Sequence, residues 1–384
     1  MTVLRVAVAG LGAIARTAHL PLLERRGDLF EIAALCDLSP GTLAELGGRY
    51  GVPAQHRYTS VEDLLDGARC DAVLLLTSGS HGADAEAALR AGYAVLCEKP
   101  LAFTRAEAAR VAAAEREQGG QGGGPRLMVG YMKQYDPAAV RLARLLEEAG
   151  GPAAVRSVEV VVLHPTGPDQ LAFARLPAPP ADVDGGALAA LRARDAALTD
   201  AALGKEATAR ARSLFHIVNG SVCHDLSLLR MTTGSPATVD LAAMWPGDTD
   251  PGSVELTGAL PGARARYSVR WHYLPGHAAY RETFAVHHEG GTLELAFPSP
   301  YLMNAPTVLT ATTNDGGTES RTAFRSVTEA FEEELVAFHS MVTEGTPPRT
   351  GVAGATEDLI TAQRAVARFA AQHQLPCEGE AATS

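Results

Sequence analysis

An apolar run that leads into a glycine-rich turn near the start of the chain constrains the fold most. Residues 3–9 are apolar apart from Arg5, and Gly-Leu-Gly-Ala-Ile-Ala follows at 10–15. In such a pattern the first glycine permits a tight turn, the second lets a phosphate approach the backbone, and the small final residue lets a helix pack close to the strand. The segment predicts a strand, a turn and a helix start that hold the pyrophosphate of a dinucleotide.

A carboxylate follows the second apolar run at the spacing that such a site needs. Asp37 lies 25 residues after Gly12, near the expected spacing of about 20 residues, and can hydrogen-bond the ribose hydroxyls. It would repel a 2′-phosphate, and no arginine follows it directly. We therefore predict NAD as the cofactor, with NADP as the alternative and Arg16 as the residue that could shift the balance. A competing interpretation is that Asp37 merely caps the next helix beside Ser39.

Length and composition indicate a globular protein of about two domains. The chain has 384 residues, 46% of them hydrophobic, and a net charge of −11. It has no block of basic residues, no apolar run near the roughly 20 residues of a membrane span, and no signal-peptide pattern at its start. Its five cysteines are scattered, without a Cys-x-x-Cys pair. We predict a cytoplasmic protein with no metal, nucleic-acid or membrane partner.

The pattern of apolar runs changes near residue 125. Before it, short apolar runs alternate with helical segments, which is typical of βαβ units and a parallel sheet. A glycine-rich segment at 119–125 predicts a loop there, and alternating runs over 155–313 predict antiparallel strands. The sequence assigns no role to an insert around 168–212. The expected fold is α/β, with an N-terminal Rossmann doubly wound parallel sheet (1–125), a C-terminal α+β domain with a large open, mostly antiparallel sheet (126–375), and a disordered tail (376–384).

A series of motifs along the chain resembles the Gfo/Idh/MocA family of oxidoreductases. The resemblance is strong to about residue 140 and looser beyond. It implies a nicotinamide-binding domain, then a substrate domain whose open sheet forms a homodimer or homotetramer. It also implies polyhydroxylated substrates, mostly sugars, cyclitols and their derivatives. The motifs are the glycine turn, Asp37, Thr77-Ser78-Gly79-Ser80-His81, Glu98-Lys99-Pro100 and Gly130-Tyr131-Met132-Lys133-Gln134-Tyr135-Asp136-Pro137.

The glycine turn and the resemblance together predict the cofactor-binding residues. Glu98 corresponds to a residue near the nicotinamide ribose, and His81 to one near the cofactor, although a solvated loop histidine is the simpler interpretation. Pro100 is expected to be structural, with a cis bond to the residue before it. The predicted set is Gly10, Gly12, Ala13, Ile14, Asp37, Thr77, His81, Glu98 and Lys99.

Lys99 is the predicted catalytic cation. It follows a strand of the parallel sheet, and open parallel sheets bind ligands at the carboxyl ends of their strands. Its charge can hydrogen-bond the reacting carbinol oxygen and stabilise negative charge as a proton leaves. Proton transfer by Lys99 itself would need a lowered pKa. The alternative is a surface lysine beside a structural proline.

His224 is the predicted proton-transfer residue, because an imidazole suits this work near neutral pH. The family usually carries Asp-x-x-x-His here, but the residue four positions before His224 is Gly220. Asp225 is adjacent and cannot share a helix face with His224. Two alternatives remain, namely a helix-start histidine that bonds the backbone, and His216 as the proton carrier.

The resemblance adds two residues to the predicted substrate site, which also includes Lys99 and His224. Tyr131 and Lys133 correspond to positions where the family's first domain-crossing strand reaches the substrate. Lys133 would bind hydroxyls or a carboxylate, whereas core packing is an equal alternative for Tyr131.

The sequence as a whole predicts an NAD(P)-dependent dehydrogenase or reductase that acts on CH–OH groups. A hydride would move between nicotinamide and a carbinol or ketone carbon of a sugar, a sugar derivative or a cyclitol. One alternative is an internal-redox enzyme, meaning an epimerase, eliminase or glycosidase with recycled NAD. Another is a non-catalytic nucleotide-binding regulator. The missing aspartate favours both alternatives, whereas Lys99 argues against the regulator.

Overall fold

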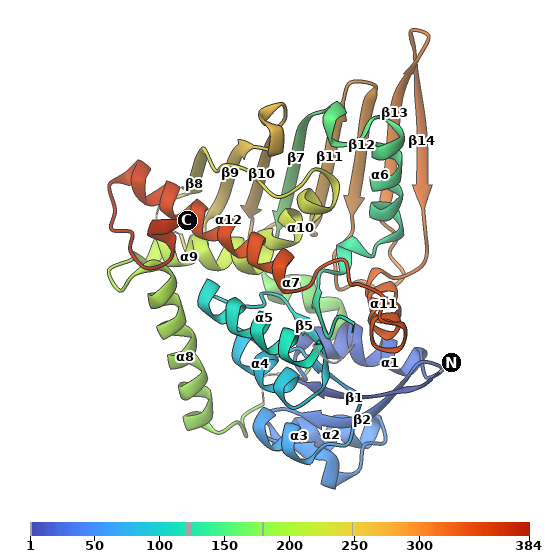
Figure 1. Cartoon of the computed structure of the whole chain (residues 1–384), viewed down its shortest axis with the longest axis vertical. Coiled ribbons are helices and arrows are strands. Elements are labelled where there is room, and N and C mark those ends of the chain that lie inside the picture. The colour runs from blue at the N-terminus through green and yellow to red at the C-terminus, as the bar shows by residue number, and fades with distance from the viewer. Residues whose placement is uncertain (1, 120–123, 179, 248) are drawn as a thin grey trace. The chain divides into compact units, whose positions relative to one another are not determined.

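Figure 1 shows the computed structural model of the chain, which describes residues 2–119, 124–178, 180–247 and 249–384. Most of the glycine-rich segment expected to form a loop, residues 120–123, therefore lies outside the described residues. The chain forms two compact units, each built from three stretches of sequence. The first unit comprises Met1–Tyr131, Phe173–Thr199 and Glu334–Thr356, and the second comprises Met132–Ala172, Asp200–Glu333 and Glu357–Ser384.

The two units interleave along the chain, whereas the sequence predicts a single boundary near residue 125. Two later stretches, Phe173–Thr199 and Glu334–Thr356, return to the first unit. The apolar pattern marks where strands and helices occur, but it does not mark which unit a later helix packs against. This is why a boundary drawn from the sequence is contiguous.

The first unit contains a fully parallel sheet, as the sequence predicts. Its strand order is β3-β2-β1-β4-β5-β6, and each neighbouring pair is parallel. Successive connections run outward in one direction from β1 and in the other from β4, so the order reverses between these two strands. Ligands of open α/β sheets bind at this reversal. The strands are β1 (Leu4–Ala9), β2 (Phe30–Cys36), β3 (Arg57–Tyr58), β4 (Ala72–Leu75), β5 (Ala94–Glu98) and β6 (Leu127–Gly130).

Short helices connect these strands, and side-chain caps define where several of them begin. Ser39 caps α2 by accepting a hydrogen bond from the Thr42 amide at 3.0 Å. Thr104 and Glu107 form a capping box at the start of α5, which satisfies two backbone donors. The helices of this unit are η1 (Ala15–His19), α1 (Leu20–Arg25), α2 (Pro40–Arg49), η2 (Ala54–His56), α3 (Val61–Gly67), α4 (Gly82–Arg90) and α5 (Arg105–Gly119).

The second unit contains a mixed sheet of eight strands, which confirms the expected large, mostly antiparallel sheet. The order is β14-β13-β12-β11-β7-β10-β9-β8, and β7 and β10 form its parallel pair. The strands are β7 (Val155–His164), β8 (Leu241–Trp245), β9 (Ser253–Ala259), β10 (Arg266–Tyr273), β11 (Arg281–His288), β12 (Gly291–Phe297), β13 (Val308–Asp315) and β14 (Thr318–Arg325).

Helices cover one face of this second sheet, and Figure 1 shows α6 and α10 in front of it. Helix α6 contacts β12, β13 and β14. The helices of this unit are η3 (Met132–Gln134), α6 (Pro137–Glu148), η4 (Gly151–Ala154), α7 (Gly167–Leu171), α9 (Ala209–Ile217), η6 (Val218–Val222), α10 (Cys223–Thr232), η7 (Pro261–Ala263) and η8 (Ala381–Thr383). Four of the described helices have residues in both units, namely η5 (Ala172–Ala174), α8 (Gly185–Leu203), α11 (Ala330–Glu344) and α12 (Val352–His373).

Alternation along the strands separates a buried face from an outward face. Val160 pairs with Phe284 across β7 and β11, and both are buried. The neighbouring positions Glu159 and Arg270 are exposed. Because side chains alternate between the faces of a sheet, one face forms the core of the unit and the other is more polar.

The C-terminal segment is ordered, in contrast to the expected disordered tail. Ala381 is buried, and the amide of Glu378 donates to the Leu203 carbonyl at 3.1 Å. Gln363 donates to the Glu380 carboxylate at 2.8 Å. The segment has no apolar periodicity, so these few anchoring contacts have no signature in the sequence.

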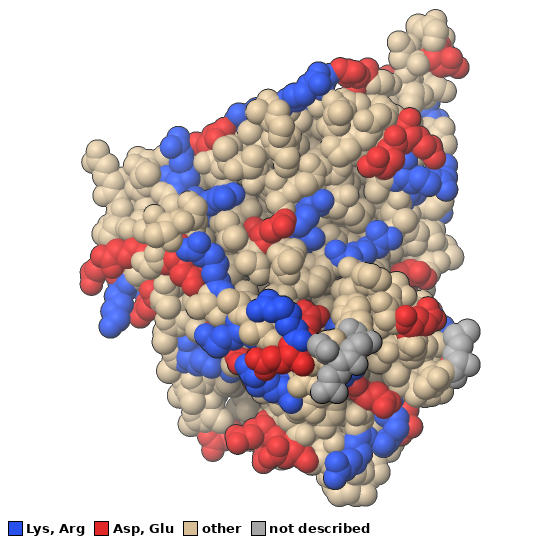
Figure 2. Space-filling model, in the orientation of Figure 1, with Lys and Arg blue, Asp and Glu red and all other residues tan. Residues whose placement is uncertain are grey.

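Among the described residues, no helix is both long and apolar enough to cross a membrane. On the face shown in Figure 2, basic and acidic side chains are interspersed.

Candidate functional site

The glycine turn after β1 lies directly against the end of β4. Gly10 has a φ of +91°, and a Cβ atom there would lie 2.6 Å from the Leu76 carbonyl carbon and the Thr77 nitrogen. Only glycine combines this backbone angle with such a close approach. The turn therefore lies at the reversal of the sheet, where the fold predicts a ligand.

Gly12 leaves open space above the turn. A Cβ atom built at Gly12 would meet no other atom within 4 Å, although Ala15, the small residue that ends the motif, is fully buried. The absence of a side chain at Gly12 is thus not required for packing, and the space suits a phosphate that approaches the backbone. This open space is the first feature that fits a dinucleotide.

We predict that Gly12→Ala weakens NAD binding without weakening the fold. The added methyl group would occupy the space a pyrophosphate needs, so we expect the Kd for NAD+ to rise about tenfold or more, with the free energy of unfolding changed by less than about 0.5 kcal/mol. Calorimetric titration and chemical denaturation measure the two quantities. Gly48→Ala is the matched control, because a Cβ at Gly48 also meets nothing within 4 Å. Unchanged NAD+ affinity in Gly12→Ala would contradict this placement.

Asp37 is held at the edge of the glycine turn by two backbone donors. The Leu11 amide donates to its Oδ2 at 2.9 Å and the Ser39 amide to its Oδ1 at 2.9 Å. The cap of α2 is Ser39, so the interpretation of Asp37 as the cap is wrong. The two donors orient the carboxylate and leave lone pairs for ribose hydroxyls.

A cavity of about 560 Å³ adjoins the glycine turn. It is bordered by the turn, by Asp37, by the start of α2 and by part of the insert. Gly12 and Ala13 line it, whereas Ile14 and Gly10 are not among its lining residues. The insert residues that line it are Leu176, Pro177, Ala178, Pro180, Ala181 and Asp182.

The loop after β4 supplies a further feature that fits a dinucleotide. The Thr77 hydroxyl oxygen is buried, and no described residue hydrogen-bonds it. His81 is 1% exposed, so it is not a solvated loop histidine. Its ring nitrogens lie 2.8 Å from the Pro100 carbonyl and 2.9 Å from the Thr77 carbonyl. His81 therefore ties the loops after β4 and β5 together.

Glu98 is the last residue of β5, the next strand in the sheet, and Lys99 follows it directly. His19 is fully buried and lies 3.0 Å from Glu98 through its Nε2. Burial acts to raise the pKa of Glu98, but the hydrogen bond and charge of His19 outweigh it, so that the pKa is lowered. Lys99 is half-buried, and its bond to Pro100 is cis, as predicted. His19 was not predicted from the sequence, and its position in the helix after the glycine turn was the available signal.

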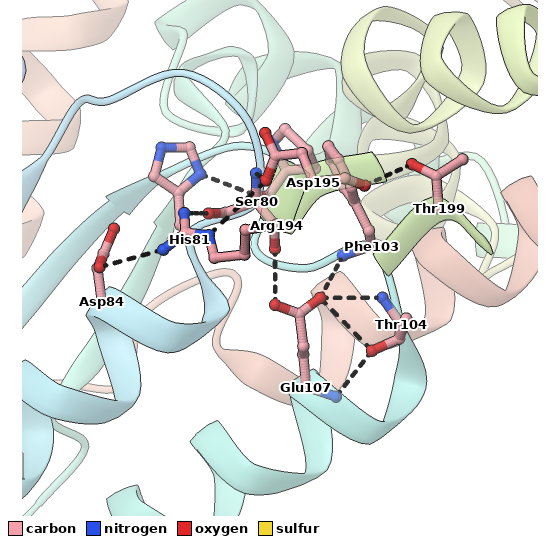
Figure 3. Close-up of polar contacts among 10 residues, drawn as sticks. Ser80, His81, Asp84, Phe103, Thr104, Glu107, Arg194, Asp195 and Thr199 are labelled. Carbon is pink, nitrogen blue, oxygen red and sulfur yellow. Dashed lines mark hydrogen bonds and ion pairs between the residues drawn. The ribbon is translucent and has the colours of Figure 1, made fainter. Parts of the chain in front are cut away.

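The insert helix α8 docks on the loop after β4 (Figure 3). Arg194 donates to the Ser80 carbonyl at 3.0 Å and pairs with Asp84 at 3.6 Å. The Ser80 amide lies 3.4 Å from Asp195, and the Ser80 hydroxyl donates to Glu107 at 3.0 Å. The insert without an assigned role thus supports a loop that the sequence assigns to the cofactor.

Tyr131 is the last residue of the first stretch of the first unit and is 2% exposed. Its phenol ring is part of the packed interior, which agrees with the core-packing interpretation. Substrate contact by Tyr131 stays a prediction.

Lys133 lies in a buried polar cluster of the second unit. It is 6% exposed, and its Nζ lies 2.5 Å from Glu282 Oε2 and 3.8 Å from Asp225 Oδ1. The Tyr280 hydroxyl also donates to Glu282. Burial opposes the charge of Lys133, but the carboxylates of Glu282 and Asp225 outweigh it and raise its pKa. Its positive charge is thus already compensated within the protein.

The two acids of this cluster, Asp225 and Glu282, were not predicted from the sequence as partners of Lys133. Burial and the charge of Glu282 raise the pKa of Asp225 well above its ordinary value. A signal for Glu282 did exist. It lies two residues before Phe284 on β11, and alternation places both on the buried face.

His224 is the second residue of α10 and is half-buried. The π-helical turn η6 precedes it and contains Gly220, where a Cβ atom would meet nothing within 4 Å. Asp225 points into the Lys133 cluster instead of replacing the missing aspartate. The other candidate, His216, is exposed, with its ring against Phe215. In the described part of the chain, no group of three or more His, Cys, Asp or Glu residues is arranged to hold a metal ion.

Residues 4–123 match the family model described as "Oxidoreductase family, NAD-binding Rossmann fold". Inositol 2-dehydrogenase of Salmonella typhimurium is 32% identical over 155 residues, which is 40% of this chain and 44% of that protein. Inositol 2-dehydrogenase 3 of Saccharopolyspora erythraea is 35% identical over 170 residues, which is 44% of this chain and 47% of that protein. The chain thus spans less than half the length of these curated relatives.

Solved structures resemble the chain over nearly its whole length. Aldose-aldose oxidoreductase from Caulobacter crescentus has a TM-score of 0.70 at 22% identity and covers 97% of this chain and 98% of its own. KijD10, a 3-ketoreductase from Actinomadura kijaniata in complex with TDP-benzene and NADP, has a TM-score of 0.69 at 19% identity and covers 94% and 96%. At these identities the likeness establishes the shared fold.

Proposed function

We propose, from the match of residues 4–123 to the NAD-binding Rossmann domain of the Gfo/Idh/MocA oxidoreductase family, that the chain is an NAD(P)-dependent oxidoreductase acting on CH–OH groups. The observation that carries this proposal is the cradle at the reversal of the parallel sheet. There, open space at Gly12 adjoins the oriented carboxylate of Asp37, and the Thr77 hydroxyl lacks a partner among the described residues. A bound nicotinamide would supply the hydride acceptor or donor.

The proposed roles follow from the chemistry of each side chain. Lys99, at the carboxyl end of β5, would hydrogen-bond the reacting oxygen and stabilise its negative charge. Glu98, held by His19 at 3.0 Å, would hydrogen-bond the nicotinamide ribose. His224 would accept and return the proton of the reacting hydroxyl.

The proposed substrate class is a sugar, a sugar derivative or a cyclitol. Curated relatives are named inositol 2-dehydrogenases, and structural neighbours are named for reactions of aldoses and a keto group. The compensated charge of Lys133 favours a neutral polyol over a carboxylate at that position, because an engaged ammonium is a weaker ligand for a second anion.

We also propose that copies of the chain associate through the outward face of the second sheet, as a homodimer or homotetramer. Every second residue of its strands lies on this outward face, which includes partly exposed apolar residues such as Val161 and Leu163. Sedimentation of the wild type and of Val161→Glu would test this arrangement, since a new charge in an interface should yield monomers.

The defining experiment incubates the purified protein with NAD+ or NADP+ and a panel of sugars, sugar acids and cyclitols. A substrate-dependent rise in the absorbance of reduced nicotinamide would support dehydrogenase chemistry and give the substrate class. Product without released reduced cofactor would support internal redox recycling instead. Cofactor binding with no product from any compound would favour a regulatory role.

We predict that His224→Asn lowers kcat by about 10²–10⁴-fold, because a positioned proton carrier contributes on this scale. The pH dependence of kcat should flatten at the same time, which a purely structural role for the imidazole would not produce. Steady-state assays across pH measure both effects. The control is His216→Asn, at an exposed histidine. An unchanged pH profile in His224→Asn would refute the assignment.

A further inference from the structure

A segment of the insert, described at residues 176–178 and 180–182, borders the same cavity as Asp37 and the glycine turn. We call this segment the strap. It joins the cavity from far along the sequence, since its Asp182 contacts residues 141 and 143 positions earlier. Helix α8 follows the strap and is fixed to the loop after β4 by Arg194 and Asp195 (Figure 3).

Asp182 lies at the start of α2, in a position suited to an anion. The Ser39 hydroxyl donates to its Oδ1 at 2.6 Å, and the Gly41 amide donates to its Oδ2 at 2.6 Å. Helix starts attract anions through free amides and the helix dipole. The two hydrogen bonds lower the pKa of Asp182, so the group is an anion at neutral pH.

This position adjoins the predicted ribose site. Asp37, the carboxylate expected to bind the ribose hydroxyls, accepts a hydrogen bond from the Ser39 amide. Asp182 is bound by the Ser39 hydroxyl. A phosphate on the ribose 2′-oxygen would therefore need the hydroxyl and amide donors that Asp182 already occupies.

The charges around the cavity also disfavour a phosphate. Its lining contains three carboxylates, those of Asp37, Glu45 and Asp182, and among the described lining residues one basic side chain, Arg16. Arg16 donates two hydrogen bonds to Glu45, at 3.0 and 3.1 Å. The arginine that could favour NADP is thus paired with an acid.

We propose that Asp182 is a cofactor-selectivity residue, which holds the anion position at the start of α2 and thereby excludes the 2′-phosphate of NADP. The inference rests on the proposed function in one respect, the use of NAD(P). It assigns part of the cofactor selectivity to a residue outside 4–123, the range that matches the family model. Selectivity then depends on Asp37 and Asp182 together.

The test is calorimetric titration of NAD+ and NADP+ into the full chain carrying Asp182→Asn. The asparagine side chain is isosteric and uncharged, so like-charge repulsion of a 2′-phosphate is reduced. We expect the Kd for NADP+ to fall about tenfold or more, and the Kd for NAD+ to change less than about threefold. The matched control is Asp184→Asn, which removes a charge two residues away and keeps the cap that Asp184 gives the Ala187 amide at 2.7 Å.

A second probe isolates the adenosine end of the cofactor. Adenosine 2′,5′-bisphosphate should gain affinity in Asp182→Asn, whereas adenosine 5′-monophosphate should not. Equal losses for both dinucleotides, or an unchanged ratio of their affinities, would overturn the selectivity role alone. Failure of the unmodified chain to bind either dinucleotide would overturn the cofactor premise as well, so the two failures are distinguishable.

Discussion

Replacing Lys99 with alanine is expected to lower kcat/KM for the alcohol substrate by about 10²–10³-fold, the scale of removing one donor that stabilises a developing oxyanion. Lys99 follows β5 at the carboxyl edge of the parallel sheet, where ligands of this fold bind. The Kd for NAD+ should stay within about threefold, since the glycine turn and Asp37 hold the other end of the cofactor. Steady-state kinetics and calorimetry separate the two effects.

The chain offers a matched control for this variant. Lys205 is exposed, and Lys205→Ala removes the same charge without touching the parallel sheet. Lys99→Arg is a further comparison, because it keeps the charge but replaces a compact ammonium with a planar group. It should recover only part of the lost rate. If Lys99→Ala keeps more than half the wild-type kcat/KM with the substrate found by the panel, Lys99 is not the polarising group.

Local patterns explain why much of the fold was predictable. The parallel strands are short apolar runs because they are buried on both faces, as the successive residues Ala7 and Val8 of β1 show. The second sheet alternates because one face is packed and the other is not. The interleaving of the two units was not predictable, since segments such as Phe173–Thr199 carry ordinary helical patterns whatever they pack against.

The residues of the candidate site likewise include some that the sequence predicted and some that it did not. Gly10, Gly12 and Asp37 were found because their spacing within one βαβ unit is fixed by the ligand they bind. Partners far apart in sequence had no such signature. Ser39 and Asp182 are separated by 143 residues, and Lys133 and Glu282 by 149. The roles of Lys99 and His224 stay predictions.

The buried Lys133–Glu282 pair carries the second large expected effect, this time on stability. Glu282→Gln is expected to lower the free energy of unfolding of the second unit by about 3 kcal/mol, because it leaves a buried ammonium without its main counter-charge. Burial and the charge of Glu282 together raise the pKa of Asp225. With Glu282 made neutral, Asp225 ionises more readily and offsets part of the loss. Lys133→Met should lower the same free energy of unfolding by about 3–5 kcal/mol, because the described cluster holds no other cation to pair with the buried Glu282 carboxylate.

The double variant Lys133→Met with Glu282→Gln tests whether the two charges stabilise the second unit as a pair. Removing both charges leaves neither the ammonium nor the Glu282 carboxylate buried without its partner, so the double variant should lose about 2 kcal/mol less than the sum of the single losses. Denaturation followed by tryptophan fluorescence reports this unit, since both tryptophans, Trp245 and Trp271, lie in it. Glu148→Gln, in an exposed pair with Arg144, should cost less than about 0.5 kcal/mol. Additive losses in the double variant would mean that the two side chains act independently, and that the short contact between them does not stabilise the second unit.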